Sequence, residues 1–524
     1  MSKKTFAGER RRPLPVFALA ILLACAAVLA AMPASASAAT GSISDRVIAM
    51  SQEDFDEEMS GASIGVQVGG NVDTYVESHY PNANIQQFQS IADTVAALEA
   101  GKVDYACAPE PVAQLHMRQG ADITYLTPEL YTCEDRIALA KGNDELRDKI
   151  DEVLVSMADS GQLDAIRKKW CEDGDYDLSD MPVREDGEVL RVAFTSTNEP
   201  CTFILDGKPA GCDVEILERV AYELGMRVEF FDMTFSAKLA AITADKVDVG
   251  LYVVKTDERA EVMDFSEPLY DLRWVVMTVD DTVETPGFFE GLRTRFEATF
   301  LTESRWTSVL TGLDITAGIS LGSFALATAG GAGLCAMRCS RRRWLRRLAA
   351  GYCRVATGIP VLVWLMILYY IAFRGVSVPA ELVAIICFGL VTSAPLSGVF
   401  KAGLDAVDAG QLEAALAMGF SQREAMHRVV LPQALQSVWD LYAGQLTALI
   451  KGTSVVGYVA ITDLTKVSDI IRSRTFDAFF PLVSVALVYF VIIALAAWAL
   501  KRVARRMDPK SRRPEAILKG IKAR

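Results

Sequence analysis

Four stretches in the C-terminal part of the chain carry no charged residue over about the length of a bilayer-spanning helix, roughly 20 residues. They lie between residues 314 and 338, 354 and 374, 381 and 401, and 477 and 501. A fifth candidate, about 440–462, is interrupted by Lys451. These runs predict an all-α membrane domain over residues 300–507 with five transmembrane helices.

The distribution of Lys and Arg predicts the orientation of these helices. With five spans, the segments 338–347, 401–436 and 501–513 lie on one side, and all three are rich in Lys and Arg. Basic segments stay in the cytoplasm. Four spans would place the C-terminus on the opposite side, so the charge pattern favours the fifth helix. Lys451 either marks a functional site within the membrane or lies near an interface and reaches water.

The charge balance separates this basic region from an acidic block. Residues 41–305 carry a net charge of −30 and the remainder carries +17, which together give −13. An acidic soluble block lacks the basic face that nucleic-acid binding needs. We therefore expect no nucleic-acid partner.

The first 40 residues have the pattern of a secretory signal. Five basic residues within 1–12 precede a long apolar run and a stretch of small residues, PASASAA. This is the order of a signal peptide, although the apolar run is also long enough for an uncleaved signal anchor. Either form places the block that follows outside the cytoplasm.

The loop between the third and fourth uncharged runs is the most specific feature of the chain. From residue 410 it reads GQLEAALAMGFSQREAMHRVVLPQAL. It resembles the EAA loop of ABC-importer permeases, and the resemblance covers about residues 300–505. The matching positions are Glu413, Ala414, Ala415, Gly419, Leu431 and Pro432. A short helix, a glycine bend and a second helix ended by proline would form a compact cytoplasmic knob.

The resemblance implies that this knob contacts a separate ATPase subunit. No G-x-x-x-x-G-K-[ST] sequence occurs in the chain, so ATP would be hydrolysed by another polypeptide. The chain is therefore expected to be a transporter subunit, not an enzyme, and to need no cofactor of its own. A single permease domain needs a second half, which makes a homodimer the default, with a paired permease subunit as the alternative.

The acidic block, residues 41–287, resembles a type II periplasmic amino-acid-binding protein. Residues 188–280 match the family's first segment, with a hairpin turn at Asp206-Gly207, T-x-x-R at 256–259 and D-F-S-x-P-x-Y at 264–270. Residues 61–130 match its middle segment and 131–172 its end. The resemblance implies a two-lobed α/β domain, with 61–130 as the second lobe and the other two segments as the first.

These segments follow one another in an unusual order. The family order is first, middle, end, whereas this chain has middle, end, first. One circularly permuted domain with residues 173–187 as the new linker explains the order, since the termini of compact domains often lie close together. Two truncated copies, each lacking a lobe, are the alternative.

The resemblance also implies a set of ligand-binding residues. Arg259 matches the arginine that holds the α-carboxylate of the ligand, and a guanidinium fork suits a carboxylate because two parallel hydrogen bonds form. Thr256 lies one helical turn before it, and Phe235 matches an aromatic wall. Asn71 stands where the middle segment often has Thr. Pro109 replaces the aspartate that usually takes the ammonium group of the ligand, and Glu110 adjoins it.

The cysteines of the acidic block predict a disulfide. An extracytoplasmic compartment permits such bonds. With a two-residue turn at Asp206-Gly207, Cys201 and Cys212 lie opposite each other across the hairpin. A second bridge between Cys133 and Cys171 is a further expectation, with Cys107 left as a free thiol.

Together these features predict a binding-protein and permease subunit of an ATP-driven importer in the plasma membrane. The ligand would be a polar amino acid or a similar small carboxylate. The alternative is a membrane receptor or ligand-gated channel that binds such a ligand without transporting it. The EAA loop disfavours the channel, and only a short tail after residue 510 is available for a signalling output.

Overall fold

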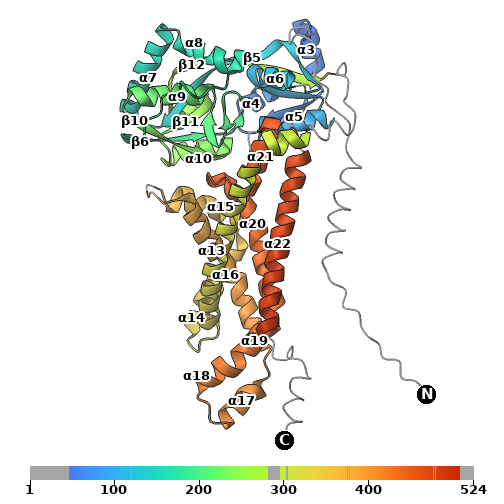
Figure 1. Cartoon of the computed structure of the whole chain (residues 1–524), viewed down its shortest axis with the longest axis vertical. Coiled ribbons are helices and arrows are strands. Elements are labelled where there is room, and N and C mark those ends of the chain that lie inside the picture. Colours follow the sequence, from blue (N-terminus) through green and yellow to red (C-terminus); the bar gives the residue numbers. More distant parts are fainter. Residues whose placement is uncertain are drawn as a thin grey trace, which may run out of the picture.

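The computed structural model describes residues 46–119, 121–280, 295–302, 305–374, 376, 378–475, 477 and 479–507. The N-terminal signal predicted within residues 1–40 lies outside these residues. The described chain forms an α/β domain, residues 46–280, on top of an elongated helical part, residues 295–507 (Figure 1).

One mixed sheet runs through the α/β domain. Its strand order is β10-β6-β11-β5-β12-β4-β2-β3, with β1 paired to β5. The strands are β1 (Ile48–Ala49), β2 (Ser63–Gln67), β3 (Asn84–Phe88), β4 (Tyr105–Pro109), β5 (Ile123–Ala140), β6 (Glu188–Phe194), β10 (Met226–Asp232), β11 (Val249–Val254) and β12 (Met263–Val279).

The two long antiparallel strands β5 and β12 join the two halves of this sheet, and we call them the hinge strands. One end of the pair continues into β11, where Val249 lies opposite Leu139. The other end continues into β4, where Val276 lies opposite Cys107. We call the half built on β6, β10 and β11 the first lobe, and the half built on β2, β3 and β4 the second lobe.

Amphipathic helices cover both lobes. In the second lobe, for example, α5 buries Ile91, Val95 and Leu98, and the Ser90 hydroxyl caps its N-terminus. The helices of the second lobe are α3 (Gln52–Met59), α4 (Val72–His79), α5 (Ile91–Glu99) and α6 (Glu110–Arg118). Those of the first lobe are α7 (Asp144–Asp159), α8 (Gln162–Arg167), η1 (Lys168–Asp173), α9 (Cys212–Glu223), α10 (Phe235–Thr243) and α11 (Asp257–Val262).

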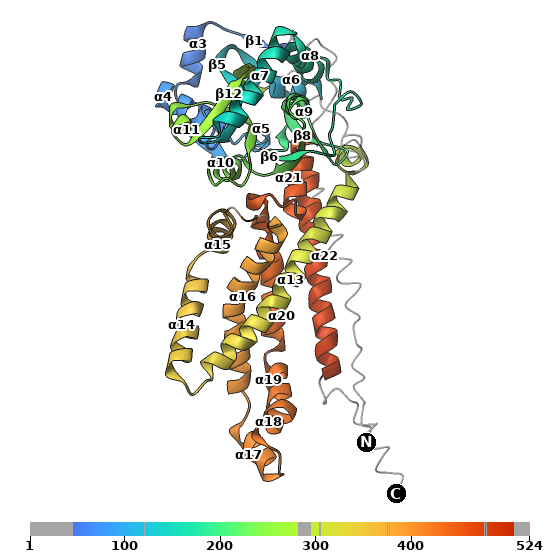
Figure 2. The ribbon, with the colours of Figure 1, turned by 90° about the vertical axis from the view of Figure 1, so that its left-hand side faces the viewer.

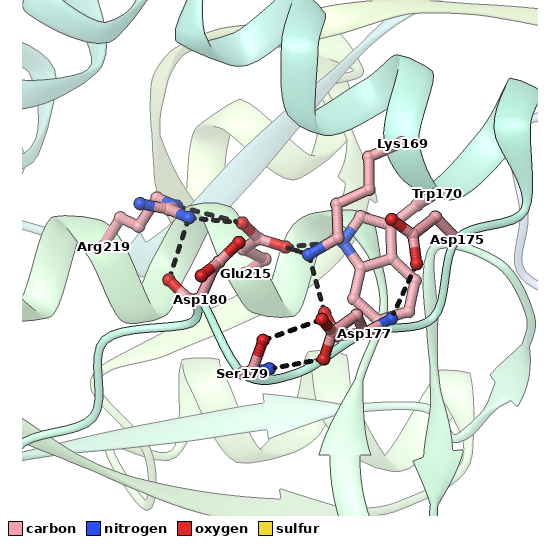
Figure 3. A network of polar contacts seen from close by, with 8 residues as sticks. All are labelled: Lys169, Trp170, Asp175, Asp177, Ser179, Asp180, Glu215 and Arg219. Carbon is pink, nitrogen blue, oxygen red and sulfur yellow. Dashed lines mark hydrogen bonds and ion pairs between the residues drawn. The ribbon is translucent and has the colours of Figure 1, made fainter.

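The segment that follows η1 is fastened to the first lobe through a buried carboxylate (Figure 3). Glu215 of α9 accepts hydrogen bonds from Trp170 Nε1 at 2.7 Å, Lys169 Nζ at 3.0 Å and Arg219 Nη2 at 2.6 Å. The same Lys169 ammonium donates to the carbonyl oxygen of Asp177 at 2.7 Å. These contacts attach the chain between residues 173 and 187 to the domain. The domain limits and the circular permutation stay predictions.

A small hairpin in the first lobe has the predicted register. β8 (Thr202–Leu205) pairs with β9 (Lys208–Ala210), and Leu205 lies opposite Lys208 across the turn. Asp206 and Gly207 both have positive φ, 49° and 78°, as a two-residue turn of this kind needs. Strand β7 (Thr197–Asn198) completes this second sheet.

The disulfide predicted from this hairpin is absent, and so is the second bridge. Cys201, Cys212, Cys133 and Cys171 are all free thiols. The ladder ends at the pair Phe203 and Ala210, so Cys201 lies before β8 and Cys212 is already the first residue of α9. Cys201 and Cys212 remain neighbours, because the Cys212 amide donates to the Pro200 carbonyl oxygen at 3.1 Å and the Asp213 amide donates to that of Cys201 at 3.2 Å. The Cys171 thiol contacts both of their thiols.

The helical part contains fewer long helices than predicted. Among the described residues, α13 (Trp306–Arg338), α16 (Ala380–Asp405) and α22 (Phe479–Met507) are long and apolar enough to cross a membrane. A fourth span would be the bent pair of α14 (Arg343–Gly358) with α15 (Val361–Met366) and η4 (Ile367–Ala372), whose axes differ by 104°. The prolyl ring of Pro360 stands at this break, where a helix cannot continue unaltered.

The fifth predicted span is not confirmed as a helix of that length. α20 (Trp439–Gly452) has 14 residues and passes into the 3₁₀ turn η6 (Thr453–Val459). At about 1.5 Å per residue, α20 alone is shorter than the roughly 30 Å apolar core of a bilayer.

The remaining helices lie at the two ends of the helical part. η2 (Glu297–Leu301) and α21 (Leu464–Thr475) lie near the α/β domain. The elements α17 (Ala409–Ala417), α18 (Gln422–Ala425), η5 (Met426–Val430) and α19 (Leu431–Ser437) form the opposite end (Figures 1 and 2). The α/β domain and the EAA-like loop therefore occupy opposite ends of the molecule.

Candidate ligand-binding and coupling sites

The guanidinium group of Arg259 joins the two lobes. Its Nη1 donates to the carbonyl oxygen of Val254 in the first lobe at 2.6 Å, and its Nη2 donates to the carbonyl oxygen of Gly69 in the second lobe at 2.7 Å. Burial lowers the pKa of Arg259, while nearby Asp73 acts in the opposite direction. Both hydrogen bonds go to neutral carbonyls, which leaves the positive charge able to attract an anion.

Thr256 and Phe235, two of the predicted ligand-binding residues, lie beside Arg259 in the first lobe. The Thr256 hydroxyl caps α11 by accepting from the Arg259 amide N at 3.3 Å. The ring centroid of Phe235 lies 5.4 Å from Arg259 Cζ. This is the range of a cation–π contact, and the capped helix and the ring together fix the direction in which the guanidinium points.

Asn71 approaches the same region from the second lobe. It is the N-cap residue of α4, and its side chain makes no capping hydrogen bond there. Burial raises the pKa of Cys133 to about 11, whereas contact with the Asn71 side chain acts to lower it. Asn71 therefore lies next to a hinge strand, two residues after the Gly69 carbonyl that Arg259 contacts.

Glu110 is engaged in a different set of contacts. Its carboxylate forms an ion pair with Arg273 of β12 and accepts from Gln114 Nε2 at 3.1 Å and Tyr125 Oη at 3.3 Å. A cation is thus already bound to this carboxylate. The proposed role of Glu110 toward an ammonium group stays a prediction, and a ligand would compete there with Arg273.

Sequence reasoning missed the aromatic residues of the hinge strands. The ring of Tyr131 stacks on Tyr75 of α4 with centroids 4.5 Å apart, and lies 6.0 Å from the ring of Trp274. Tyr131 lies opposite Trp274 in the ladder between β5 and β12. That Tyr131 and Trp274 face each other could not be predicted from either strand alone, because the two residues are more than 130 positions apart in the sequence.

A buried ionisable cluster behind Phe235 was also missed. Lys238 is fully buried, and its Nζ donates to the carbonyl oxygens of Leu251 at 2.6 Å and Tyr252 at 3.2 Å. Its ammonium lies 4.9 Å from the Phe235 centroid, and burial lowers its pKa to about 7. The available signal was the helical spacing of residues 235, 238 and 242, which puts this lysine on the buried face of α10.

Two fully buried carboxyl groups lie close to this lysine. Burial raises the pKa of Asp135 and raises that of Asp213 to about 7, and nearby Lys238 opposes both shifts. Tyr270 Oη donates to Asp213 Oδ1 at 2.6 Å. The first lobe thus carries an acidic core behind the surface that Phe235 forms.

The EAA-like loop forms a projecting knob made of α17, the bend at Gly419 and α18. Gly419 has φ +89°, a conformation that a glycine adopts without strain. Glu413 and Ala414 are exposed, whereas Ala415 is buried in the knob. Met418 is 70% exposed, so the tip of the knob presents an apolar side chain to solvent.

Pro432 does not end the second helix of the knob, contrary to the prediction. The chain continues from α18 through the π-helical turn η5 into α19, and Leu431 and Pro432 lie at the start of α19. Proline is tolerated in the first turn of a helix, and the wide η5 turn changes the hydrogen-bond register just before it.

A cavity of about 590 Å³ lies between the α/β domain and the helical part. The hairpin of β8 and β9 contributes Asp206 and Gly207, and the starts of α13 and α21 contribute the opposite wall. This cavity is distinct from the place where Arg259 meets Gly69. Lys451 lies in the last turn of α20 with an exposed side chain, and both interpretations of it stay open.

Comparison with known proteins decides the family of the helical part. Residues 318–509 match the model of the binding-protein-dependent transport system inner membrane component. A probable amino-acid ABC transporter permease protein of Bacillus subtilis is 31% identical over 190 residues, which are 36% of this chain and 84% of that protein. The chain belongs to this permease family. A similar permease protein of Sinorhizobium fredii is 30% identical over 203 residues, 38% of this chain and 87% of that protein.

Solved structures are similar to each part of this permease. A crystal structure of an amino acid ABC transporter with histidines covers 40% of this chain and 98% of that chain, with 28% identity and a TM-score of 0.36. A probable amino-acid ABC transporter extracellular-binding protein of Bacillus subtilis covers 45% of this chain and 91% of that chain, with 8% identity and a TM-score of 0.25.

Proposed function

We propose that this permease is the fused substrate-binding and membrane subunit of an ATP-driven importer for a polar amino acid or a similar small carboxylate. The α/β domain would bind the ligand outside the cytoplasm. Closure of its lobes would be passed to the helical part, and a separate ATPase subunit would drive the change of access across the membrane.

The position of Arg259 is the observation that carries the ligand-binding part of this proposal. A half-buried guanidinium extends from α11 of the first lobe to the Gly69 carbonyl of the second. A ligand carboxylate can replace a neutral carbonyl at this guanidinium with a stronger, charge-assisted pair. Arg259 of the first lobe and Asn71, two residues after Gly69 in the second lobe, would then line the ligand site together, which makes closure and binding one event.

Two arguments support an amino acid as the ligand. Two of the relatives with 30% identity or more are described as probable amino-acid ABC transporter permease proteins, and a third is described as a putative glutamine transport system permease protein. In the first lobe the carboxyl groups of Asp135 and Asp213 also lie, fully buried, beside Lys238, whose ammonium is 4.9 Å from the Phe235 ring centroid.

The exposed knob supports the ATPase-coupling part of the proposal. Glu413, Ala414 and Gly419 lie on its surface, and the apolar Met418 at its tip fits a groove on a partner protein. The knob projects from the end of the helical part opposite to the α/β domain (Figure 2). With the knob in the cytoplasm, the α/β domain is outside.

The assembled importer would be a homodimer of this chain with two copies of an ATPase subunit. ATP would act on that partner, and this chain would need no cofactor. The binding domain would be circularly permuted, with residues 173–187 joining the end segment to the first segment. The five-span arrangement is kept in this proposal by counting α14–η4 and α20 with η6 as spans.

Uptake in proteoliposomes tests the proposal. The full chain, reconstituted with its ATPase subunit, should accumulate a radiolabelled polar amino acid only when ATP is present on the knob side. The matched control is Glu413→Ala, which should bind the amino acid in a thermal-shift assay and fail to accumulate it. Ligand binding with no ATP-dependent uptake by the unaltered chain would favour the receptor or channel instead.

A further inference from the structure

Helix α21 of the permease carries three cations that pair with carboxylates of the α/β domain. Lys466 Nζ lies 3.2 Å from Asp232 Oδ1, Arg472 Nη1 lies 2.6 Å from Asp93 Oδ1, and Arg474 Nε lies 3.0 Å from Glu199 Oε2. All six side chains are between 3% and 21% exposed. Ion pairs so well shielded from water are screened little by salt and depend strongly on geometry.

These three pairs connect one helix to both lobes. Asp232 ends β10 and Glu199 follows β7, so both belong to the first lobe. Asp93 lies in the first turn of α5 and belongs to the second lobe. In both views of the molecule α21 lies directly below the α/β domain (Figures 1 and 2).

The attachment of the first lobe to the helical part is extensive. Arg474 Nη1 donates to the carbonyl oxygen of Ile204 at 2.8 Å, and its Cζ lies 5.1 Å from the ring centroid of Phe203. Tyr370 Oη donates to the carbonyl oxygen of Ala237 at 3.2 Å. Lys246 Nζ donates to the carbonyl oxygen of Phe373. These contacts involve the hairpin, α10 and the loop before β11, which are all parts of one lobe.

The attachment of the second lobe to α21 has a different character. Within the described residues, a single side-chain ion pair, between Arg472 and Asp93, joins the second lobe to α21. The same guanidinium group also pairs with an acid of its own helix. Arg472 Nη2 donates to Asp469 Oδ1 at 3.0 Å while Nη1 pairs with Asp93. Asp469 precedes Arg472 by one helical turn, a spacing at which the two can pair without any help from the lobe.

We propose that the first lobe is the fixed anchor of the binding domain on the permease, and that the Arg472–Asp93 pair forms when the second lobe closes. In the open state Arg472 keeps Asp469 as its partner. In the closed state Asp93 arrives and α21 is held by both lobes. The helix thereby detects closure, and the switch is the gain of a second carboxylate, Asp93, by a guanidinium group that already holds Asp469.

Thermodynamic linkage gives this arrangement a measurable consequence. If the pair exists only in the closed state, and ligand also favours the closed state, then each strengthens the other. Removing the pair should weaken the apparent affinity for ligand in the full chain, although neither residue touches the ligand. The inference rests on the proposed function, since it needs a ligand that closes the lobes.

Cysteine cross-linking in the full chain, reconstituted in nanodiscs, tests the inference. The test variant is Asp93→Cys with Arg472→Cys, and the matched control is Glu199→Cys with Arg474→Cys. The probe is a mixture of the standard L-amino acids, and the cross-linked peptides are identified by mass spectrometry. We expect the probe to raise the 93–472 yield at least severalfold and to leave the 199–474 yield unchanged. Equal yields with and without the probe at both positions, or a rise at both, would overturn the inference.

Charge reversal provides a second measurement that does not depend on cysteine chemistry. Asp93→Arg and Arg472→Asp should each weaken the apparent affinity severalfold, and the double variant should restore it. A double variant as weak as the single ones would overturn the inference. If the unaltered chain gives no thermal shift with the probe, the proposed function fails; if it binds the probe but these variants change nothing, only the inference fails.

Discussion

Arg46 and Asp280 form a buried ion pair with Nε and Oδ2 2.9 Å apart, although 234 residues separate them in sequence. Arg46 also donates to the carbonyl oxygens of Ala121 and Ile123 at the start of β5. The two residues are the first and last described residues of the α/β domain. The start of the described α/β domain therefore lies beside its end, which is where the predicted unpermuted order would join the first segment to the middle segment.

This meeting of the ends predicts that the order of the segments can be reversed. A soluble chain that joins residues 188–280 to residues 46–172 through a short Gly/Ser linker should fold, because the linker spans only the gap beside the Arg46–Asp280 pair. Circular dichroism and thermal unfolding should resemble those of residues 46–280. The control joins the segments in the same order with Asp280→Ala, which should lower the unfolding free energy by roughly 3–5 kcal/mol. Two independent half-domains would instead unfold separately.

Arg259→Ala should abolish most ligand binding. Removal of one partner of a buried charged pair typically costs roughly 2–5 kcal/mol of binding free energy. Isothermal titration of the full chain with the amino acid that gives the largest thermal shift measures the loss. Arg259→Lys is the matched control, since it keeps the charge but removes the fork, and we expect intermediate affinity. Unchanged affinity in Arg259→Ala would assign this residue to lobe–lobe contacts alone.

Gly419→Asp should abolish uptake and preserve ligand binding. The positive φ of Gly419 strains any other residue, and the new carboxylate would stand on the exposed knob where a partner groove is expected. Gln422→Asp places the same charge on an exposed neighbour in the first turn of α18, where it is compatible with the helix dipole, and should be tolerated. Normal uptake by Gly419→Asp in proteoliposomes would contradict the coupling role.

The cysteines of the binding domain should be recovered as free thiols. Burial raises the pKa of Cys212 to about 11 and that of Cys107 to about 12, so little thiolate is present at neutral pH. Iodoacetamide should therefore label these residues slowly in the folded chain and completely after unfolding without reductant. Peptide mass spectrometry provides the measurement. A peptide that joins Cys201 to Cys212 would reverse the correction made from the structure.

Acid should destabilise the binding domain through His116. Burial lowers the pKa of this imidazole to about 3, whereas an unfolded chain has a pKa near about 6.5. Between these values the unfolded state binds a proton that the folded state does not, so stability is present above pH 6.5 and declines as the pH falls toward 3. The expected contribution is about 1.4 kcal/mol for each pH unit crossed. His116→Gln should flatten the decline in denaturant unfolding, and an unchanged slope would argue against this contribution.

Local chemistry made parts of this molecule predictable from sequence. The Asp206-Gly207 turn fixes the register of its hairpin because both residues accept positive φ, and the observed pair of Leu205 and Lys208 follows from it. Three of the long uncharged runs form helices that are long and apolar enough to cross a membrane, because length and apolarity alone decide whether a helix can do so. The predicted disulfide between Cys201 and Cys212 is absent. These residues lie two positions beyond the last pair of the β8–β9 ladder, and Gly211, with φ +124°, directs the chain into α9.

Other parts depended on contacts between distant segments. Nothing in the sequence LTKVSDIIRSRT shows that its cations meet Asp93, Glu199 and Asp232, which come from both lobes. The length of helix α20 was overestimated because the apolar run continues into η6, where the backbone is no longer α-helical. Glu110 directly follows β4, and its pairing with Arg273 depends on the register between β4 and β12, which the sequence alone does not show.

The presence of α21 and both lobes in one polypeptide changes the kinetics of their association. Docking becomes a unimolecular step, and a short tether gives the binding domain an effective concentration on the order of millimolar near α21. At that concentration an interaction with a dissociation constant of about 1 mM is occupied about half of the time, whatever the number of copies the cell makes. Individual ion pairs can then break and reform rapidly during each cycle, whereas a freely diffusing binding protein would have to be abundant to achieve the same occupancy.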